Sequence, residues 1–382
     1  MTRKLSITGM ILIVILSSCA SGQNERTVNA PEDIEEGKLY LETIDMPEGF
    51  RIKTFATGLD DARSMALGPE GNIFVGNRTE DKVYLIRDTD GDYKEDERHV
   101  LVEDLNMPNG VAFHNGDLYV AEVNRILKFP DIMDNYDQQP HYEVVYDEFP
   151  TDRHHGWKYI GFGPDGKLYV PVGAPCNICD SEEDIFATIT RMDPDGSNLE
   201  IYAEGIRNTV GFAWHPETDE LWFTDNGRDH LGDNRPPDEL NKAPRQGMHF
   251  GYPYCHGQDI SDPKFGGGKS CADYTTPVQE LGPHVAALGM IFYTGNMFPD
   301  AYRNRILIAE HGSWNRSEKI GYRIMMVETE NGEARSYKPF AEGWLQGEQV
   351  WGRPVDILQL RDGSLLVSDD YGDAIYRISY EV

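Results

Sequence analysis

The feature that most constrains this chain is a short segment, a turn followed by an apolar strand, that recurs six times along it. The copies lie at residues 68–75, 114–120, 163–170, 215–223, 302–308 and 360–367. Turn pairs such as Asn115-Gly116 and Asp165-Gly166 have the backbone preferences of hairpin connections. A second strand-like segment follows most of the copies, at residues 82–86, 125–129, 189–192, 322–327 and 374–378.

The spacing of these segments predicts the fold. The turn glycines Gly71, Gly116, Gly166 and Gly363 mark a period of about 45 to 60 residues, which is typical of propeller blades. Helical periodicity is nearly absent, so a pair of β-sandwiches or an irregular all-β enzyme fits the repeats less well. We predict an all-β chain, a six-bladed β-propeller of four-stranded antiparallel blades over residues 41–382. The long gap at residues 229–282 predicts an insertion on one face, and Phe50–Thr57 is the expected ring-closing strand.

The first residues are expected to be a targeting segment and not part of the fold. Arg3 and Lys4 precede an apolar stretch at residues 5–16, and small residues then lead to Cys19. This order resembles a bacterial lipobox, which implies a signal peptide at residues 1–18 and lipidation of Cys19. The alternative is an ordinary signal peptide. Residues 19–40 are then a flexible tether, and the protein is an exported lipoprotein on the periplasmic or cell-surface side.

Export permits disulfide bonds among the other four cysteines. Cys176 and Cys179 form a C-x-x-C motif, which is also found in redox sites and in half of a zinc site. The preferred interpretation is one local disulfide there and a second between Cys255 and Cys271. Four cysteines allow three pairings, and the sequence does not choose among them.

The charge of the chain limits its partners. Sixty-five acidic and 35 basic residues give a net charge of −30, which repels phosphate backbones and anionic membrane surfaces. Nucleic acid is therefore not an expected partner, and a membrane is expected only through the N-terminal lipid.

Five loop motifs stand in order at the ends of the predicted strands. They are Asp152-Arg-His-His-Gly-Trp157, Glu204-Gly-Ile-Arg-Asn208, Thr224-Asp-Asn-Gly-Arg228, His311-Gly-Ser-Trp-Asn-Arg316 and Trp351-Gly-Arg-Pro-Val-Asp356. This set resembles the soluble glucose and sorbosone dehydrogenase family over roughly residues 40–380, and the sorbosone-type branch most closely. The resemblance implies a quinoprotein that uses pyrroloquinoline quinone (PQQ) and calcium.

The resemblance also implies roles for individual residues. His155 matches the general base, a task for which histidine has a suitable pKa. Arg207 matches the cation that stabilises charge on the quinone, and Asn208 contacts the same edge. Arginine suits the three carboxylates of the cofactor. The positions that match the cofactor-binding cations of the family are Arg353 together with either Lys319 or Arg316.

Calcium accepts backbone carbonyl oxygens, and the positions that match the family ligands are Gly227 and Arg228, with Asp238 as a supporting carboxylate. Arginine at position 228 departs from the family pattern. A second, weaker calcium candidate is the acidic turn with Asp88, Asp90 and Asp92, followed by Glu95 and Asp96; a solvated turn without metal is the alternative.

The expected activity is oxidation of an aldose sugar or an aldehyde, with a separate cytochrome or quinone as electron acceptor. The alternatives are a calcium-dependent propeller hydrolase, such as a lactonase, and a non-enzymatic binding propeller. A hydrolase of that kind requires carboxylate and Asn ligands that converge on the channel axis, and the motifs show no clear set of these.

Overall fold

The structure is a computed structural model that describes residues 34–35 and 37–381. The expected signal peptide and Cys19 lie outside the described residues, as does part of the expected tether. Among the described residues, no helix has both the length and the apolar character needed to cross a bilayer.

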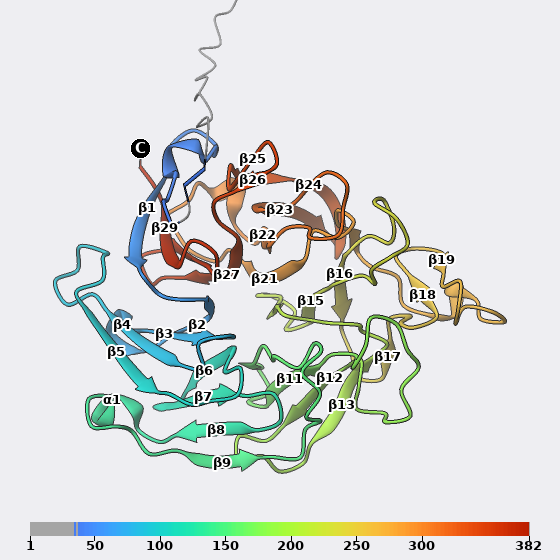
Figure 1. Cartoon of the computed structure of the whole chain (residues 1–382), viewed down its shortest axis with the longest axis horizontal. Helices are drawn as coiled ribbons and strands as arrows, with labels where there is room; N and C mark the ends of the chain where they lie inside the picture. The colour runs from blue at the N-terminus through green and yellow to red at the C-terminus, as the bar shows by residue number, and fades with distance from the viewer. Residues whose placement is uncertain (1–33, 36, 382) are drawn as a thin grey trace, which may run out of the picture.

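Six antiparallel sheets surround a central axis, which confirms the predicted six-bladed β-propeller (Figure 1). The first blade consists of β2 (Ala62–Leu67), β3 (Ile73–Asn77), β4 (Val83–Arg87) and β5 (Glu97–Val102). The second consists of β6 (Gly110–His114), β7 (Asp117–Ala121), β8 (Ile126–Phe129) and β9 (Glu143–Tyr146), with the short helix α1 (Ile132–Asn135) between its last two strands. In each blade, the recurring segment of the sequence forms the second strand.

The third and fourth blades share the region that was expected to be an insertion. The third contains β10 (Gly161–Phe162), β11 (Leu168–Val172), β12 (Thr188–Met192) and β13 (Glu200–Glu204), and β17 (Met248–His249) pairs with it as a fifth, parallel strand. The fourth contains β14 (Phe212–Trp214), β15 (Leu221–Asp225), β16 (Glu239–Ala243) and β20 (Gln279–Glu280).

Two expectations are corrected here. Not every blade has four strands, because β17 extends the third. The segment 229–282 is not wholly an insertion, because β16 and β20 within it are blade strands. The remainder carries β17 and the small hairpin of β18 (Cys255–His256) and β19 (Ile260–Ser261). Both expected disulfides form: Cys176–Cys179, with a Cα–Cα distance of 6.2 Å, and Cys255–Cys271, at 5.6 Å.

The last two blades close the ring. The fifth consists of β21 (Ala287–Phe292), β22 (Ile306–Glu310), β23 (Arg323–Glu330) and β24 (Glu333–Glu342), and the small hairpin of β25 (Leu345–Gln346) and β26 (Gln349–Val350) follows it. The sixth has β27 (Pro354–Gln359), β28 (Leu365–Asp369) and β29 (Ala374–Tyr380). Its outer strand is β1 (Phe50–Thr57), which pairs from Phe50 opposite Tyr380 to Thr57 opposite Ala374. The predicted ring-closing strand is thus confirmed.

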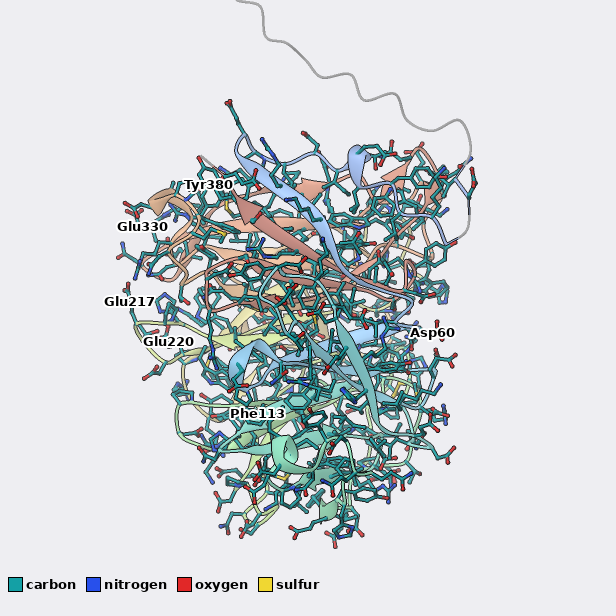
Figure 2. All side chains as sticks on the ribbon, turned by 90° about the vertical axis from the view of Figure 1, so that its left-hand side faces the viewer. Asp60, Phe113, Glu217, Glu220, Glu330 and Tyr380 are labelled. Atoms are coloured by element: carbon teal, nitrogen blue, oxygen red, sulfur yellow. A yellow bond between two sulfur atoms is a disulfide. The ribbon has the colours of Figure 1, made fainter. Side chains whose placement is uncertain are left out.

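The core lies between the blades. Six apolar clusters fill the six interfaces between adjacent sheets, and a seventh, with Val210, Leu288 and Val355, lies at the axis. Because each second strand is covered on both faces, β3, β11, β15, β22 and β28 are buried along their whole length. Acidic side chains such as Asp60, Glu217 and Glu330 are exposed around the outside (Figure 2).

Candidate functional site

A cavity of about 340 Å³ opens at the end of the ring where the first strands of the blades begin and the second strands end. The antiparallel order brings these strand ends to one face, which is why loop motifs far apart in the sequence meet there. The polar lining comes from five blades and consists of Arg63, Arg78, His155, Trp157, Arg207, Asn208, Asn226, Asp229, Asp238, His284, His311, Trp314, Asn315, Tyr322 and Arg353.

His155 precedes β10 and is held with one ring nitrogen free. Its Nδ1 lies 2.8 Å from the carbonyl oxygen of Ala174, and because a carbonyl only accepts, Nδ1 carries the proton. Nε2 is therefore the basic nitrogen. Burial, and then the charge of Arg207, hold the pKa of His155 well below its ordinary value, so the ring is neutral at pH 7. The adjacent His154 is exposed and does not line the cavity.

The backbone around His155 is closely packed. Its φ of +52° lies in the left-handed region that side chains other than glycine rarely adopt. A Cβ atom placed on Gly173 would lie 2.6 Å from the Cβ of His155, so the chain at residue 173 approaches this closely only as glycine. Local strain and close packing of this kind are typical of functional sites.

Arg207 is buried and is held by a clamp that the sequence did not reveal. Its Nε donates to the carbonyl oxygen of Asn177 at 2.9 Å, and its Nη2 donates to the Asn177 Oδ1 at 3.0 Å. Nη2 also lies 3.1 Å from Asp229 Oδ2. Asn177 belongs to the loop closed by the Cys176–Cys179 disulfide, so that loop fixes the Arg207 guanidinium at the cavity wall.

Asn208 follows Arg207, and both are fixed through their backbone. Their N–H groups donate to the two carboxylate oxygens of Asp225, at 3.0 Å from Arg207 and 2.7 Å from Asn208. Asp225 pairs across the sheet with Glu239, and both are buried. Burial raises the pKa of Asp225 to about 6, and burial together with the charge of Asp225 raises the pKa of Glu239 to about 8.

The loop after β15 presents the residues expected at the calcium site. The Gly227 N–H donates to Asp238 Oδ1 at 2.8 Å, and burial raises the pKa of Asp238 to about 7. The carbonyl oxygens of Gly227 and Arg228 accept no hydrogen bond from any residue within 34–35 and 37–381. Both are thus free for a hard cation, and the Asp238 carboxylate lies beside Gly227, so these oxygen donors are of the kind that calcium accepts. The Arg228 side chain does not line the cavity, because it pairs with Asp262 at 2.6 Å.

Arg353 lies in a cationic cluster around one buried carboxylate. Asp370 contacts Arg353 Nε at 3.0 Å, Arg63 Nη1 at 2.7 Å and His311 Nε2 at 2.9 Å. Despite burial, the interaction with His311 and the charges of Arg63 and Arg353 hold the pKa of Asp370 far below its ordinary range. Together with Arg78, the cluster has more cations than carboxylates, which suits a ligand that carries several carboxylates.

The structure does not bring Arg316 or Lys319 to the cavity. Arg316 donates to the carbonyl oxygens of Glu318 and Asp233, and Lys319 Nζ lies 2.5 Å from the carbonyl oxygen of Glu348. Neither side chain is in the lining. The loop after β22 directs Trp314 and Asn315 toward the cavity instead.

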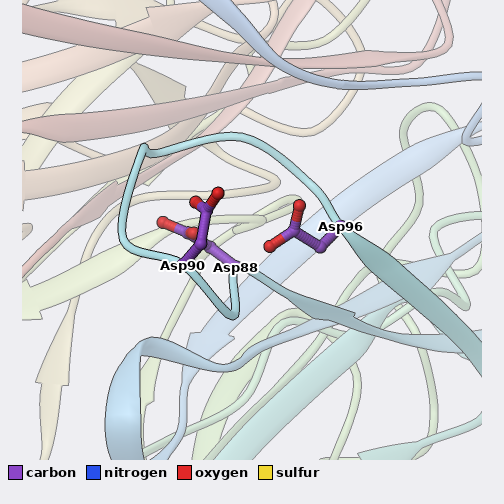
Figure 3. Close-up of side chains that lie close together, drawn as sticks. All are labelled: Asp88, Asp90 and Asp96. Atoms are coloured by element: carbon purple, nitrogen blue, oxygen red, sulfur yellow. The ribbon is translucent and has the colours of Figure 1, made fainter.

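Figure 3 shows the acidic turn between β4 and β5. None of its residues lines the cavity. Carboxylate oxygens of Asp88, Asp90 and Asp96 lie within 4.8 Å of one another, so Asp96 replaces the expected Asp92 in the cluster. Asp92 pairs with Lys94 at 3.2 Å. Asp88 accepts hydrogen bonds from Gly91 and Tyr93, and Asp96 from Thr89, which are contacts of a tight turn without any metal.

Several lining residues were missed in the sequence. Arg63 lies at the start of β2, Arg78 follows β3, and His311 follows β22. Arg78 and His311 occupy the same position as Asn226 and Asp370 in other blades, directly after a second strand. A polar residue at this position was therefore a usable signal, since Arg78, Asn226 and His311 all line the cavity.

Three comparisons place the chain among known proteins. The family model described as "Domain of unknown function (DUF7133)" matches residues 36–377. An uncharacterized protein of Borreliella burgdorferi is 33% identical over 354 residues, which cover 89% of this chain and 91% of that protein.

Solved structures show the same fold. The calcium structure of a Trichoderma reesei carbohydrate-active enzyme of family AA12 superposes with a TM-score of 0.77 at 19% identity, covering 88% of this chain and 97% of that chain. The holo form of the pyranose dehydrogenase PQQ domain from Coprinopsis cinerea has a TM-score of 0.72 at 18% identity, with coverage of 88% and 97%. The likeness to PQQ-dependent dehydrogenases inferred from the loop motifs is thus confirmed at the level of the fold.

Proposed function

Because the chain belongs to the family described as a domain of unknown function (DUF7133), its family supplies no activity, and we propose one from the cavity. We propose that the protein is a PQQ- and calcium-dependent dehydrogenase that oxidises an aldose sugar or an aldehyde. The observation that carries this proposal is a neutral, Nδ1-protonated His155 facing a cavity rich in arginine. Similar solved structures include the PQQ domain of a pyranose dehydrogenase, which supports sugar oxidation in general.

His155 is the proposed general base. When bound, PQQ supplies a hydride acceptor for the substrate C–H bond. His155 Nε2 removes the proton of the substrate hydroxyl as that C–H bond breaks, so the alcohol or hemiacetal loses one hydride and one proton. The hydrogen bond from Nδ1 to Ala174 holds the tautomer and the ring orientation that this transfer requires.

The other residues provide binding and charge. Arg207 lies in the same wall as His155 and presents a fixed cation to negative charge that develops in the transition state. The carbonyl oxygens of Gly227 and Arg228 are the proposed calcium ligands, with Asp238 in support. Arg353 and Arg63 bind carboxylates of the cofactor. This surplus of cations favours an anionic cofactor over a hydrolase site, which requires converging carboxylates.

The rim of the cavity suits a sugar. Trp314 is 72% exposed although it lines the cavity, and an exposed indole offers an apolar face to a pyranose ring. Two buried polar atoms of lining residues, His284 Nδ1 and Asn315 Oδ1, have no hydrogen-bond partner among the described residues. Both accept hydrogen bonds, as hydroxyl groups of a sugar require.

Reconstitution tests this function. Purified protein is titrated with PQQ in the presence and absence of calcium, and dye-linked oxidation is then measured on a panel of aldoses, sorbosone and simple aldehydes. We expect saturable cofactor binding and turnover of at least one substrate. His155→Gln is the matched variant, with retained cofactor affinity and lost turnover. Binding without turnover of any member of the panel contradicts the assigned reaction, and no binding of PQQ contradicts the function as a whole.

The cell location and the electron acceptor are separate proposals. We infer export as a lipoprotein, anchored on the periplasmic or cell-surface side, from the order of residues before Cys19. Metabolic labelling with a radioactive fatty acid, lost in Cys19→Ser, tests the anchor. Reoxidation requires a separate carrier, a cytochrome or a quinone, because the sequence has no C-x-x-C-H haem-attachment motif.

A further inference from the structure

Arg78 is a cation of the cavity wall whose guanidinium forms no ion pair with any residue that the structure describes. Among the residues that the structure describes, its guanidinium has no hydrogen bond or ion pair, and its backbone N–H alone donates, to Asp61 Oδ2 at 2.8 Å. The other three arginines of the cavity each have a carboxylate partner: Arg63 and Arg353 share Asp370, and Arg207 pairs with Asp229. In a chain with a net charge of −30, an unpaired arginine inside a cavity requires an explanation.

Trp157 holds Arg78 in place and has an unused donor of its own. The Arg78 guanidinium lies 5.0 Å from the centroid of the Trp157 ring, a cation–π contact that keeps its N–H groups available. The Nε1 of Trp157 is buried and has no hydrogen-bond partner among the described residues. Both side chains line the same cavity, so a fixed cation and an indole N–H lie side by side without an acceptor.

We propose that Arg78 and Trp157 form a binding element for a carboxylate group, and that this carboxylate belongs to the cofactor. This inference rests on the proposed function, because it assigns a residue to the PQQ site. It also replaces an expectation: Arg316 or Lys319 was to supply a cation for this ligand, and both lie outside the cavity with partners of their own. Arg78 supplies that cation from the first blade.

The surroundings of Arg78 favour the cofactor over the substrate as the source of the carboxylate. The charges of Arg63, Asp61, Asp370 and Arg353 all act on Arg78, so the three arginines form one region with two carboxylates and a surplus of positive charge. Burial, and then the charge of Arg63, lower the pKa of Arg78, although Asp61 and Asp370 act in the opposite direction. A ligand with three carboxylates matches this region, whereas a neutral aldose has no group that requires a third arginine.

Titration of the purified protein with PQQ, followed by quenching of tryptophan fluorescence, tests the inference. Arg78→Met keeps an apolar stem over Trp157 and removes the charge; its Kd for PQQ is expected to rise about 10- to 100-fold, since hydrogen bonds to charged groups are among the stronger ones. Arg78→Lys is expected to recover part of the affinity. Lys53→Met on the exposed outer strand removes the same charge and is expected to leave Kd unchanged. Thermal melting of each apo variant verifies that it is folded.

Four outcomes overturn the inference. An unchanged Kd in folded Arg78→Met, with normal PQQ binding by the unaltered protein, refutes the role of Arg78 and leaves the proposed function intact. If Lys319→Met raises the Kd for PQQ and Arg78→Met does not, the cation that binds this carboxylate is Lys319 of the fifth blade. If Arg78→Met keeps its affinity for PQQ but raises KM for glucuronate relative to glucose, the carboxylate is that of an acidic substrate. No PQQ binding by the unaltered protein refutes both proposals together.

Discussion

Replacing Asp370 with asparagine tests the electrostatic account of the cavity. Asp370 follows β28, and its side chain is fully buried. It contacts Arg63, Arg353 and His311 at 2.7 to 3.0 Å, and the Arg63 side chain is itself only 1% exposed. An asparagine at this position would keep the shape of the side chain and remove its charge. The buried Arg63 guanidinium would then lose the carboxylate that compensates for its burial.

The size of the effect follows from this geometry. Removing one partner of a buried ion pair costs about 3–5 kcal/mol, because the remaining charge stays buried without compensation. Arg353 is partly exposed, so water replaces some of its lost interaction, and most of the cost arises at Arg63. We therefore expect the free energy of unfolding of the apoprotein to fall by about 3 kcal/mol or more in Asp370→Asn.

Urea unfolding, followed by tryptophan fluorescence, provides the measurement. Glu333→Gln is the matched control, because Glu333 and Arg335 form an ion pair in which both side chains are exposed. Its cost is expected to be below about 1 kcal/mol. PQQ affinity is expected to rise in Asp370→Asn, because the cavity gains net positive charge. A loss of stability as small as that of the control, or a weakened PQQ affinity in a folded variant, would refute the reasoning.

Three further predictions concern turnover, positioning and metal. His155→Gln is expected to lower kcat by about 100-fold or more. In the unaltered protein, kcat is expected to fall only well below pH 6.5, because the lowered pKa of His155 keeps the base neutral down to that pH. A kcat that already falls with decreasing pH above pH 7 contradicts this. Asn177→Ala removes the amide oxygen that accepts from Arg207 Nη2 and is expected to lower kcat up to about tenfold, since one hydrogen bond to a charged group is lost. An unchanged kcat means that the Asn177 and Asn226 carbonyl oxygens together with Asp229 hold the guanidinium without it. Removal of calcium with a chelator is expected to weaken PQQ binding equally in the unaltered protein and in Asp88→Asn, and a difference between them would assign the essential ion to the acidic turn.

Much of the fold was predictable because each blade repeats the same local pattern. Turns such as Asp165-Gly166 and the apolar strands after them are encoded within a few residues, so the six blades and the closing strand β1 followed from the sequence. The boundary of the insertion did not, because β20 has only two residues and is separated from β16 by β17 and by the hairpin of β18 and β19. β17 was also missed, because a parallel pair of two residues leaves no periodic pattern.

The site was predictable only in part, for a physical reason. Arg207, Asn208 and Arg353 reach the cavity because each lies close to a strand end, where the backbone direction is set by the blade. His155 and Arg316 lie farther into loops whose paths depend on tertiary contacts: His155 is oriented by its hydrogen bond to Ala174, whereas Arg316 turns toward Asp233. Arg78 could have been noticed from its position directly after a second strand, but only the folded structure shows that its guanidinium has no hydrogen-bond or ion-pair partner among the described residues.

The pairing of β1 with β29 has a consequence for the biogenesis of the protein. The strand at Phe50 is among the first parts of the domain to be made, yet its partner at Tyr380 is among the last. Until that partner arrives, β1 presents an unpaired edge, which is the kind of surface on which chains pair with one another and aggregate. The entropic cost of closing a loop rises only with the logarithm of its length. The time for which the edge of β1 stays exposed is therefore a greater hazard for aggregation than the entropic cost of closing the ring. Loss of β29 would leave β1 without a partner and expose one edge of β28, so this propeller should tolerate little shortening at its C-terminal strand.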